Sequence, residues 1–236
     1  MEASNLRIVI TGASRGLGLE FASHYAADGH TVFALARKPE ECGLVELAAR
    51  HGDRLRAIPC DVVDVASVAD AVAEVGSNEA AIDLLINNAG IAGVTGGQFG
   101  DLDYDDMRRV FEINTIAPVR MSEQCLPLLR AGRNPRVVHV TSRMGSIADN
   151  ESGGWWAYRM SKVALNMACK NMTFELRESS VATMVIHPGW VRTDMGGGGA
   201  SLSVEESVSG MRDVIADLDL SRTGAFRDYT GAVLPW

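Results

Sequence analysis

The chain has 236 residues, of which 47% are hydrophobic, and a net charge of −8 from 22 basic and 30 acidic residues. This length allows one large domain or two small ones, and the composition is typical of a soluble globular protein with a sizeable core. Disorder, collagen and coiled coil are therefore excluded. An acidic chain without a lysine- or arginine-rich run is a poor partner for nucleic acid, so we expect none.

The spacing of the cysteines and the N-terminal segment indicate the cellular compartment of the protein. The four cysteines lie far apart, without CxxC spacing or a histidine cluster, so neither a metal site nor a disulfide framework is expected. The N-terminal segment has no signal-peptide h-region, and the apolar runs are much shorter than a membrane span. We therefore expect a cytoplasmic protein with reduced, buried thiols that does not contact a membrane.

Short β-branched segments alternate with segments of helical period along the chain. The predicted strands are residues 7–11, 31–36, 56–60, 82–86, 136–141 and 181–187, and the predicted helices are residues 17–27, 43–50, 65–75, 103–129 and 157–178. Apolar parallel strands need crossover helices on both faces. This pattern predicts an α/β fold, a Rossmann-type doubly wound parallel sheet of about seven strands. Since no linker, repeat or low-complexity tract divides residues 1–236, we expect a single domain.

A glycine-rich turn joins the first predicted strand to the first predicted helix. It reads Thr11-Gly12-Ala13-Ser14-Arg15-Gly16-Leu17-Gly18. Glycines allow a tight turn, and backbone N–H groups at a helix start can bind a pyrophosphate. The spacing GxxxGxG differs from GxGxxG, but its place between a strand and a helix predicts a dinucleotide-binding loop.

The end of the second predicted strand indicates which dinucleotide binds. It reads Ala36-Arg37-Lys38, with no carboxylate before Glu40. A carboxylate there would bind the ribose 2′-hydroxyl of NAD, whereas an arginine accommodates the 2′-phosphate of NADP. Arg37 and Arg15 can grip a phosphate with forked hydrogen bonds, which favours NADP(H) over NAD(H).

Tyr158 and Lys162 open the last predicted helix, four residues apart and thus on one face. Such a pair alone is more often a surface contact, but Ser142 follows the fifth predicted strand and Asn114 lies within the fourth predicted helix. We expect Lys162 and an oxidised nicotinamide to lower the pKa of the phenol from ~10 towards ~7. A phenol with such a pKa is a general acid for carbonyl reduction and a base for the reverse reaction.

These motifs and their order resemble the short-chain dehydrogenase/reductase family, in its single-domain branch. The matching features are TGASRGLG at 11–18, NNAG at 87–90, Asn114, Ser142, Tyr158-x-x-x-Lys162 and Pro188-Gly189 followed by Thr193. Within the family, GGWWAYRMSK at 153–162, ALNM at 164–167 and LPW at 234–236 resemble the C-factor and sniffer-like carbonyl reductases.

The resemblance implies a role for each catalytic candidate. Tyr158 would donate the proton to the carbonyl, whose oxygen Ser142 would hold and polarise. Lys162 would lower the pKa of the phenol and hydrogen-bond the nicotinamide ribose. Asn114 would position a water that relays protons through Lys162.

The resemblance also implies the contacts of the cofactor. Asp61, with Val62 beside it, would meet the adenine. The adenosine ribose would be lined by Asn88, Ala89 and Gly90. The nicotinamide end would be held by Pro188, Gly189, Val191 and Thr193, together with Tyr158 and Lys162.

Specificity is expected in three loops, residues 93–100, 143–156 and 195–203. Met144, Trp155 and Trp156 are candidate substrate contacts beside Ser142, although packing at a subunit contact or on the core explains the tryptophans equally well. The glycine tract at 196–199 is either a mobile loop over the site or a plain connection.

Two histidines, His139 and His187, fall within predicted strands and are interpreted as satisfied core or edge residues. A methyltransferase with a similar glycine loop is disfavoured, because Arg37 stands where a carboxylate would be expected.

We therefore expect an NADPH-dependent oxidoreductase that reduces a ketone or aldehyde to an alcohol. Its partners would be a small carbonyl or alcohol substrate and further copies of itself in a homodimer or homotetramer, with a monomer as the alternative. The rival function is an NADP(H)-binding signalling or sensor protein with little turnover. The intact set of Asn114, Ser142, Tyr158 and Lys162 argues against that rival.

Overall fold

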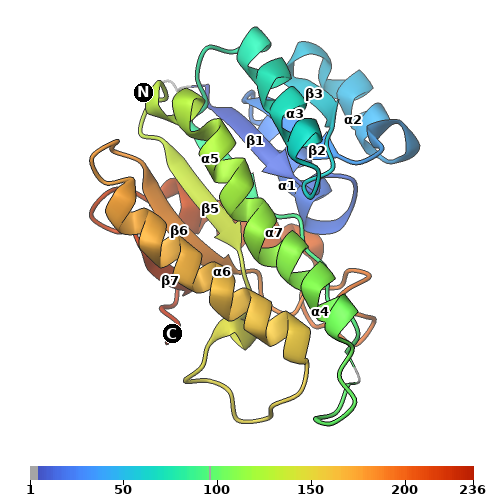
Figure 1. The fold of residues 1–236 in the computed structure, drawn as a ribbon. Helices are drawn as coiled ribbons and strands as arrows, with labels where there is room; N and C mark the ends of the chain where they lie inside the picture. Colours follow the sequence, from blue (N-terminus) through green and yellow to red (C-terminus); the bar gives the residue numbers. More distant parts are fainter. Residues whose placement is uncertain (1–4, 96) are drawn as a thin grey trace.

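The computed structural model describes residues 5–95 and 97–236, which form one α/β domain (Figure 1). Within these residues, one parallel sheet of seven strands has the order β3-β2-β1-β4-β5-β6-β7. The strands are β1 (Arg7–Thr11), β2 (Thr31–Ala36), β3 (Leu55–Pro59), β4 (Leu84–Asn87), β5 (Arg136–Val140), β6 (Ala182–His187) and β7 (Ala225–Asp228). The predicted doubly wound fold is confirmed.

Helices cover both faces of the sheet. They are α1 (Gly16–Ala27), α2 (Leu44–His51), α3 (Val65–Asn78), α4 (Tyr104–Phe111), α5 (Ala117–Arg130), α6 (Trp156–Glu175) and α7 (Val204–Ala216). The short helices are η1 (Pro39–Glu41), η2 (Gly52–Arg54), η3 (Glu112–Ile116) and η4 (Arg143–Gly145). The helices α1, α2 and α7 share one core with the sheet, whereas α3, α5 and α6 pack on its other face. Figure 1 shows α5 and α6 across the front of the sheet.

Burial on both faces explains the apolar strands. All four residues of β4 are buried, as expected of a central parallel strand. Its neighbour Asp83 is also fully buried, and the Arg7 guanidinium binds both of its carboxylate oxygens at 2.9 and 2.8 Å. The chain order reverses between β1 and β4, which is where doubly wound sheets hold ligands.

The helix predicted over residues 103–129 is interrupted. Here α4 passes into the π-helix η3, and α5 then continues to Arg130. Pro118 lacks the N–H that would bond to the carbonyl of Asn114 in a continuous α-helix. Instead, the backbone N–H of Ala117 bonds to Glu112 O, five residues earlier. The break therefore falls at the predicted site residue Asn114.

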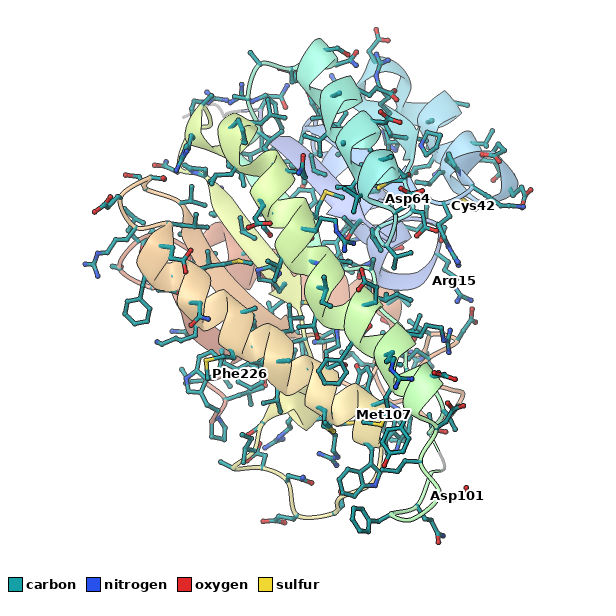
Figure 2. All side chains as sticks on the ribbon, in the orientation of Figure 1. Arg15, Cys42, Asp64, Asp101, Met107 and Phe226 are labelled. Atoms are coloured by element: carbon teal, nitrogen blue, oxygen red, sulfur yellow. The ribbon has the colours of Figure 1, made fainter. Side chains whose placement is uncertain are left out.

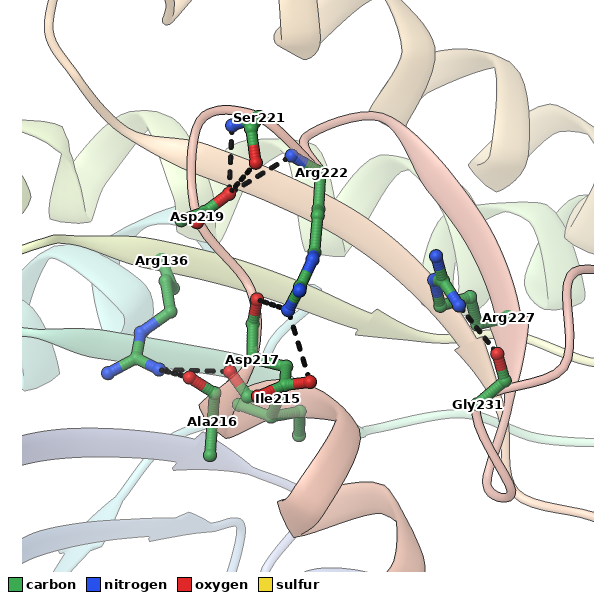
Figure 3. Close-up of polar contacts among 9 residues, drawn as sticks. All are labelled: Arg136, Ile215, Ala216, Asp217, Asp219, Ser221, Arg222, Arg227 and Gly231. Atoms are coloured by element: carbon green, nitrogen blue, oxygen red, sulfur yellow. Dashed lines mark hydrogen bonds and ion pairs between the residues drawn. The ribbon is translucent and has the colours of Figure 1, made fainter.

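The sequence analysis predicted no residue range for two elements, α7 and β7. The start of α7 carries a signal that could have found it, since Ser203 and Glu206 form a capping box. The other end of α7 is tied to the sheet, because Arg136 donates to the carbonyl of Ile215 at 2.9 Å (Figure 3).

Arg222 and Arg227 stand beside a hollow of about 200 Å³ in this region, and Arg222 pairs with Asp217 at 3.1 Å (Figure 3). Met184 lines this hollow. None of the residues that line the hollow is a predicted site residue, so the hollow is not the predicted site.

His139 is buried and His187 is half-buried; both are neutral, but neither is fully hydrogen-bonded within the described residues. Burial lowers the pKa of His139 to about 3 and that of His187 to about 4. His139 Nδ1 lies 3.2 Å from Asn87 Nδ2. Among the described residues, His139 Nε2 and His187 Nδ1 have no hydrogen-bond partner. The interpretation as satisfied histidines was therefore wrong in this respect.

In the part of the chain described here, no helix combines the length and the hydropathy required to cross a bilayer. Across residues 5–95 and 97–236, no group of three or more His, Cys, Asp or Glu side chains is arranged to hold a metal ion. All four cysteines are free thiols.

Candidate active site

The glycine loop turns from β1 into α1 in a way that only glycine allows. Gly12 and Gly16 have φ of +66° and +53°. A Cβ at Gly12 would lie 2.8 Å from Ala89 Cα, and one at Gly18 would lie 2.3 Å from Gly12 O. The loop and the turn after β4 are thus packed backbone against backbone.

The start of α1 offers free hydrogen-bond donors. Its N-cap is Arg15, whose side chain makes no capping hydrogen bond, and its first turn holds no acidic residue. The N–H groups of this turn, which contains Leu17 and follows Ser14, are therefore available to an anion. This cradle fits the pyrophosphate of a dinucleotide.

Asn88 fixes the glycine loop from the neighbouring strand. Its Nδ2 donates to Thr11 O at 3.0 Å and to Gly12 O at 3.1 Å. In return, Thr11 Oγ1 accepts hydrogen bonds from the backbone N–H groups of Asn88 and Ala89, at 3.0 and 3.1 Å. Both amide hydrogens of Asn88 are thus committed to the loop. Thr11 is a site residue that sequence reasoning missed, although a hydroxyl at the end of an apolar strand was a usable signal.

The two predicted phosphate ligands differ in their surroundings. Arg37 follows β2 and is exposed. Arg15 lies on the loop between β1 and α1, at the outside of the molecule (Figure 2), and its guanidinium pairs with Asp194 in the segment after β6. The side chains of Arg15 and Asp194 are 75% and 74% exposed. The structure thus brings Arg15 to Asp194, a partner that the sequence did not suggest.

The segment after β3 carries Asp61 and Val62 and is held by a long-range contact. Arg120 in α5 donates from Nη1 to Val62 O at 3.0 Å, and its Nη2 contacts Glu112 Oε1 at 2.8 Å. Asp61 contributes its backbone N–H to Ser67 Oγ at 2.9 Å. Arg120 was missed, because nothing in its local sequence points to this segment.

The four catalytic candidates converge at the carboxyl edge of the sheet. Ser142 follows β5, and its hydroxyl lies near enough to the Tyr158 phenol from α6 to affect the pKa of that phenol. Lys162 Nζ lies 5.7 Å from the centre of the Tyr158 ring. A Cβ at Gly90 would lie 3.2 Å from Asn114 Oδ1 and 3.6 Å from Lys162 Nζ, so Gly90 leaves open the space where these side chains meet.

Burial dominates the protonation of the tyrosine and the lysine. Desolvation raises the pKa of Tyr158, while the neighbouring Ser142 hydroxyl lowers it in part. Burial lowers the pKa of Lys162 to about 8. The sequence predicted that Lys162 and an oxidised nicotinamide together lower the pKa of the phenol. In the chain alone desolvation dominates, and Lys162 Nζ donates to Val140 O at 2.9 Å. A lowered pKa in the cofactor-bound protein stays a prediction.

Asn114 ties the segment after β4 to α6. Its Oδ1 accepts from Ile91 N at 2.9 Å, and its Nδ2 donates to Ile91 O at 2.9 Å and to Ser161 Oγ at 3.0 Å. Its amide hydrogens are therefore both used.

Ser142 is held in place by a residue that the sequence did not single out. Asn166 in α6 accepts from Thr141 Oγ1 at 2.7 Å and donates to Gly145 O at 3.0 Å. The Ser142 hydroxyl itself accepts from Met144 N at 3.1 Å. These contacts fix the end of β5 and η4 against the helix that carries Tyr158.

The segment after β6 lies close to the start of α1. A Cβ at Gly16 would lie 3.4 Å from Thr193 Cγ2. Pro188 O accepts from Ser207 Oγ at 2.6 Å, which joins this segment to α7. Gly189 has φ of +84° and Val191 is buried.

The glycine tract that follows is anchored at both ends. Trp190 Nε1 donates to Gly196 O at 2.9 Å, and Val191 pairs with Leu202 in an isolated bridge. Both ends of the glycine tract are therefore bonded to the residues that directly follow Pro188 and Gly189.

The two tryptophans occupy different places. The Trp155 ring meets the Tyr158 ring edge to face, with centroids 6.0 Å apart. Trp156 lies against Phe99, with centroids 5.7 Å apart, and thus contacts the predicted loop 93–100. Within that loop, residue 96 lies outside the described residues.

Comparison with known proteins agrees with this geometry. The short chain dehydrogenase model matches residues 7–200. C-signal of Myxococcus xanthus is 52% identical over 155 residues, which cover 66% of this chain and 93% of that protein. The NADPH-bound carbonyl reductase from chicken fatty liver superposes with a TM-score of 0.91 at 35% identity, over 98% of this chain and 99% of that one. Carbonyl reductase Sniffer of D. melanogaster gives a TM-score of 0.91 at 29% identity, over 98% and 100% of the two chains. The chain belongs to the short-chain dehydrogenase family and is an oxidoreductase of that family.

Proposed function

We propose that this protein reduces a ketone or aldehyde to an alcohol with NADPH, reversibly. The observation that carries the proposal is the meeting of Ser142, Tyr158 and Lys162 beside a glycine loop shaped for a dinucleotide. The likeness to an NADPH-bound carbonyl reductase supports the same cofactor and reaction class.

The residues present fit NADP(H) along the carboxyl edge of the sheet. The N–H groups at the start of α1 would bind the pyrophosphate. Arg37 and Arg15 would bind the 2′-phosphate. The remaining contacts fall to residues already placed at this edge: Asp61 and Val62 for the adenine, Asn88, Ala89 and Gly90 for its ribose, and Lys162, Pro188, Gly189, Val191 and Thr193 for the nicotinamide end. When bound, NADPH supplies the hydride that the carbonyl carbon accepts.

The chain's own groups hold the oxygen and deliver the proton. Ser142 hydrogen-bonds the carbonyl oxygen and polarises it. Tyr158 is a neutral phenol, because burial raises its pKa, and it can therefore donate a proton to that oxygen. Lys162, with a pKa of about 8, can then restore the proton, and a water held at Asn114 would connect it to solvent.

A homodimer or homotetramer is part of the proposal. The outer face of α6 leaves Met160, Met167 and Phe174 exposed, at intervals of seven residues. Apolar side chains repeated along one helix face are typical of a surface that is covered by another subunit.

The proposal is tested by titrating the purified protein with NADPH and NADH, and then following NADPH oxidation against aromatic, aliphatic and quinone carbonyl compounds. Tight NADPH binding with turnover of a panel member supports the reductase. Equal or better binding of NADH contradicts the assignment of Arg37 and Arg15 to the 2′-phosphate.

The similarity to C-signal favours a second candidate, an NADP(H)-binding sensor or signalling protein with little turnover. Tight NADPH binding without turnover of any compound in the panel would favour this candidate over the reductase.

A further inference from the structure

The turn that leads into α6 has an unusual backbone. Gly153, Gly154 and Trp155 are consecutive and left-handed, with φ of +63°, +67° and +50°. Glycine adopts this conformation freely, but a bulky side chain such as that of Trp155 does so only where its surroundings hold it. No atom lies within 4 Å of a Cβ built at Gly153 or Gly154, so packing around the glycines does not impose the turn.

The side chain of Arg159, in α6, stabilises this turn. Its Nε donates to Gly153 O at 3.0 Å and its Nη2 donates to Ser152 Oγ at 2.9 Å. Its backbone N–H makes the first i→i−4 bond of α6, to Trp155 O at 2.9 Å. The Arg159 side chain thus fixes the start of the left-handed turn, where Asn150 Oδ1 also accepts from Gly153 N at 3.0 Å.

The result of this conformation is the placement of one indole. The Trp155 ring stands at 65° to the Tyr158 ring, while the indole itself is only half-buried. Trp155 therefore stands beside the phenol with part of its indole open to solvent. A flat apolar group whose carbonyl reaches Tyr158 would lie against this indole.

We propose that Arg159 is a positioning residue for the carbonyl substrate and acts through Trp155. By holding the left-handed turn, Arg159 fixes the indole wall against which a planar aromatic carbonyl compound is oriented. This inference rests on the proposed reductase function, because it assigns a substrate-orienting role within the same site.

The test compares wild type with Arg159→Met, which keeps an unbranched apolar side chain but removes the guanidinium donors. Arg177→Met, at an exposed arginine beyond the end of α6, is the matched control. With acetophenone and NADPH, we expect Arg159→Met to raise KM about tenfold, the loss expected for about one hydrogen-bonded contact. The kcat and the Kd for NADPH should stay within about twofold of wild type. The lost contact stabilises the bound substrate and the transition state equally, so its loss raises KM and leaves kcat unchanged. The control should change none of these quantities.

A double-mutant cycle separates this role from simple stabilisation of the loop. In a Trp155→Gly background, Arg159→Met should change KM by less than about twofold, because the indole through which it acts is gone. The same tenfold loss in both backgrounds, a matching fall in kcat, or a weaker NADPH affinity would overturn the proposal.

A binding readout keeps this inference distinct from the proposed reaction. If wild type oxidises no NADPH with any carbonyl compound, the reductase function fails. The Kd of acetophenone for the protein saturated with NADP⁺, from tryptophan fluorescence quenching, then decides the role of Arg159. A Kd raised about tenfold in Arg159→Met supports it. An unchanged Kd, or no binding to wild type, overturns it.

Discussion

Replacing Gly18 with alanine would drive a methyl group into the backbone of the glycine loop. The added Cβ would lie 2.3 Å from Gly12 O and 2.6 Å from Asn88 Nδ2, whereas ordinary contact begins at 3.4 Å. The Gly12 carbonyl must therefore retreat by 3.4 − 2.3 = 1.1 Å. This movement would break its hydrogen bond with Asn88, which is 3.1 Å long.

Two costs follow from this displacement. Overpacking of this kind destabilises a fold by about 1–3 kcal/mol. A displaced loop also misaligns N–H groups at the start of α1, and a hydrogen bond to a charged group is worth about 1.5–3 kcal/mol. Losing one such bond should weaken NADPH binding roughly 10- to 150-fold. NADPH fluorescence titration measures the affinity, and thermal unfolding measures the stability.

Gly76→Ala is the control for this substitution. Gly76 also lies within a helix, α3, but its added Cβ would meet only the Leu128 side chain, at 3.7 Å from Cδ2 and 3.9 Å from Cδ1. This variant should be more stable by about 1 kcal/mol, because alanine has the higher helix propensity, and should bind NADPH as wild type does. If Gly18→Ala bound NADPH within twofold of wild type, the account of the loop would be refuted.

Three further predictions concern charge and protonation. Arg37→Glu should reverse the preference for NADPH over NADH, measured as the ratio of their Kd values, and an unchanged ratio would contradict the phosphate contact. The rate of carbonyl reduction should fall as pH rises through about 8, because Lys162 then loses its proton. A rate that does not change between about pH 7 and about pH 9.5 would argue against a proton relay through this lysine. Burial acts to raise the pKa of Asp83, but the Arg7 guanidinium and the backbone N–H groups of Arg133 and Arg7 hold it below its usual range. Its contribution to stability is thus present above the unfolded value of ~3.9 and is lost as pH falls through the folded value. Asp83→Ala should cost about 3–5 kcal/mol of unfolding free energy at pH 7, measured in urea, and a loss below about 1 kcal/mol would contradict its role as a buried ion pair.

Features that depend on local pattern were predictable from the sequence. Apolar strands alternating with amphipathic helices gave the sheet and six strand positions, because this alternation admits few folds. The carboxyl ends of parallel strands share one edge, so the sequence alone places Ser142 and Asn88 there.

Features that depend on distant contacts were not predictable. The hydrogen bonds of Asn88 with Thr11 and of Arg120 with Val62 join residues far apart in the chain. Asn114 was identified as a site residue, but the π-helix around it depends on Pro118 and on packing against α6. The direction of the pKa shift of Tyr158 depends on burial, which no spacing rule reports.

The most direct test of the central claim is NADPH oxidation by Tyr158→Phe beside wild type, with the NADPH Kd of each measured on the same samples. Because the phenol is the assigned proton donor, the variant should lose turnover of every compound that wild type reduces, while its Kd for NADPH stays close to that of wild type. Near-normal reduction by Tyr158→Phe would show that another group donates the proton.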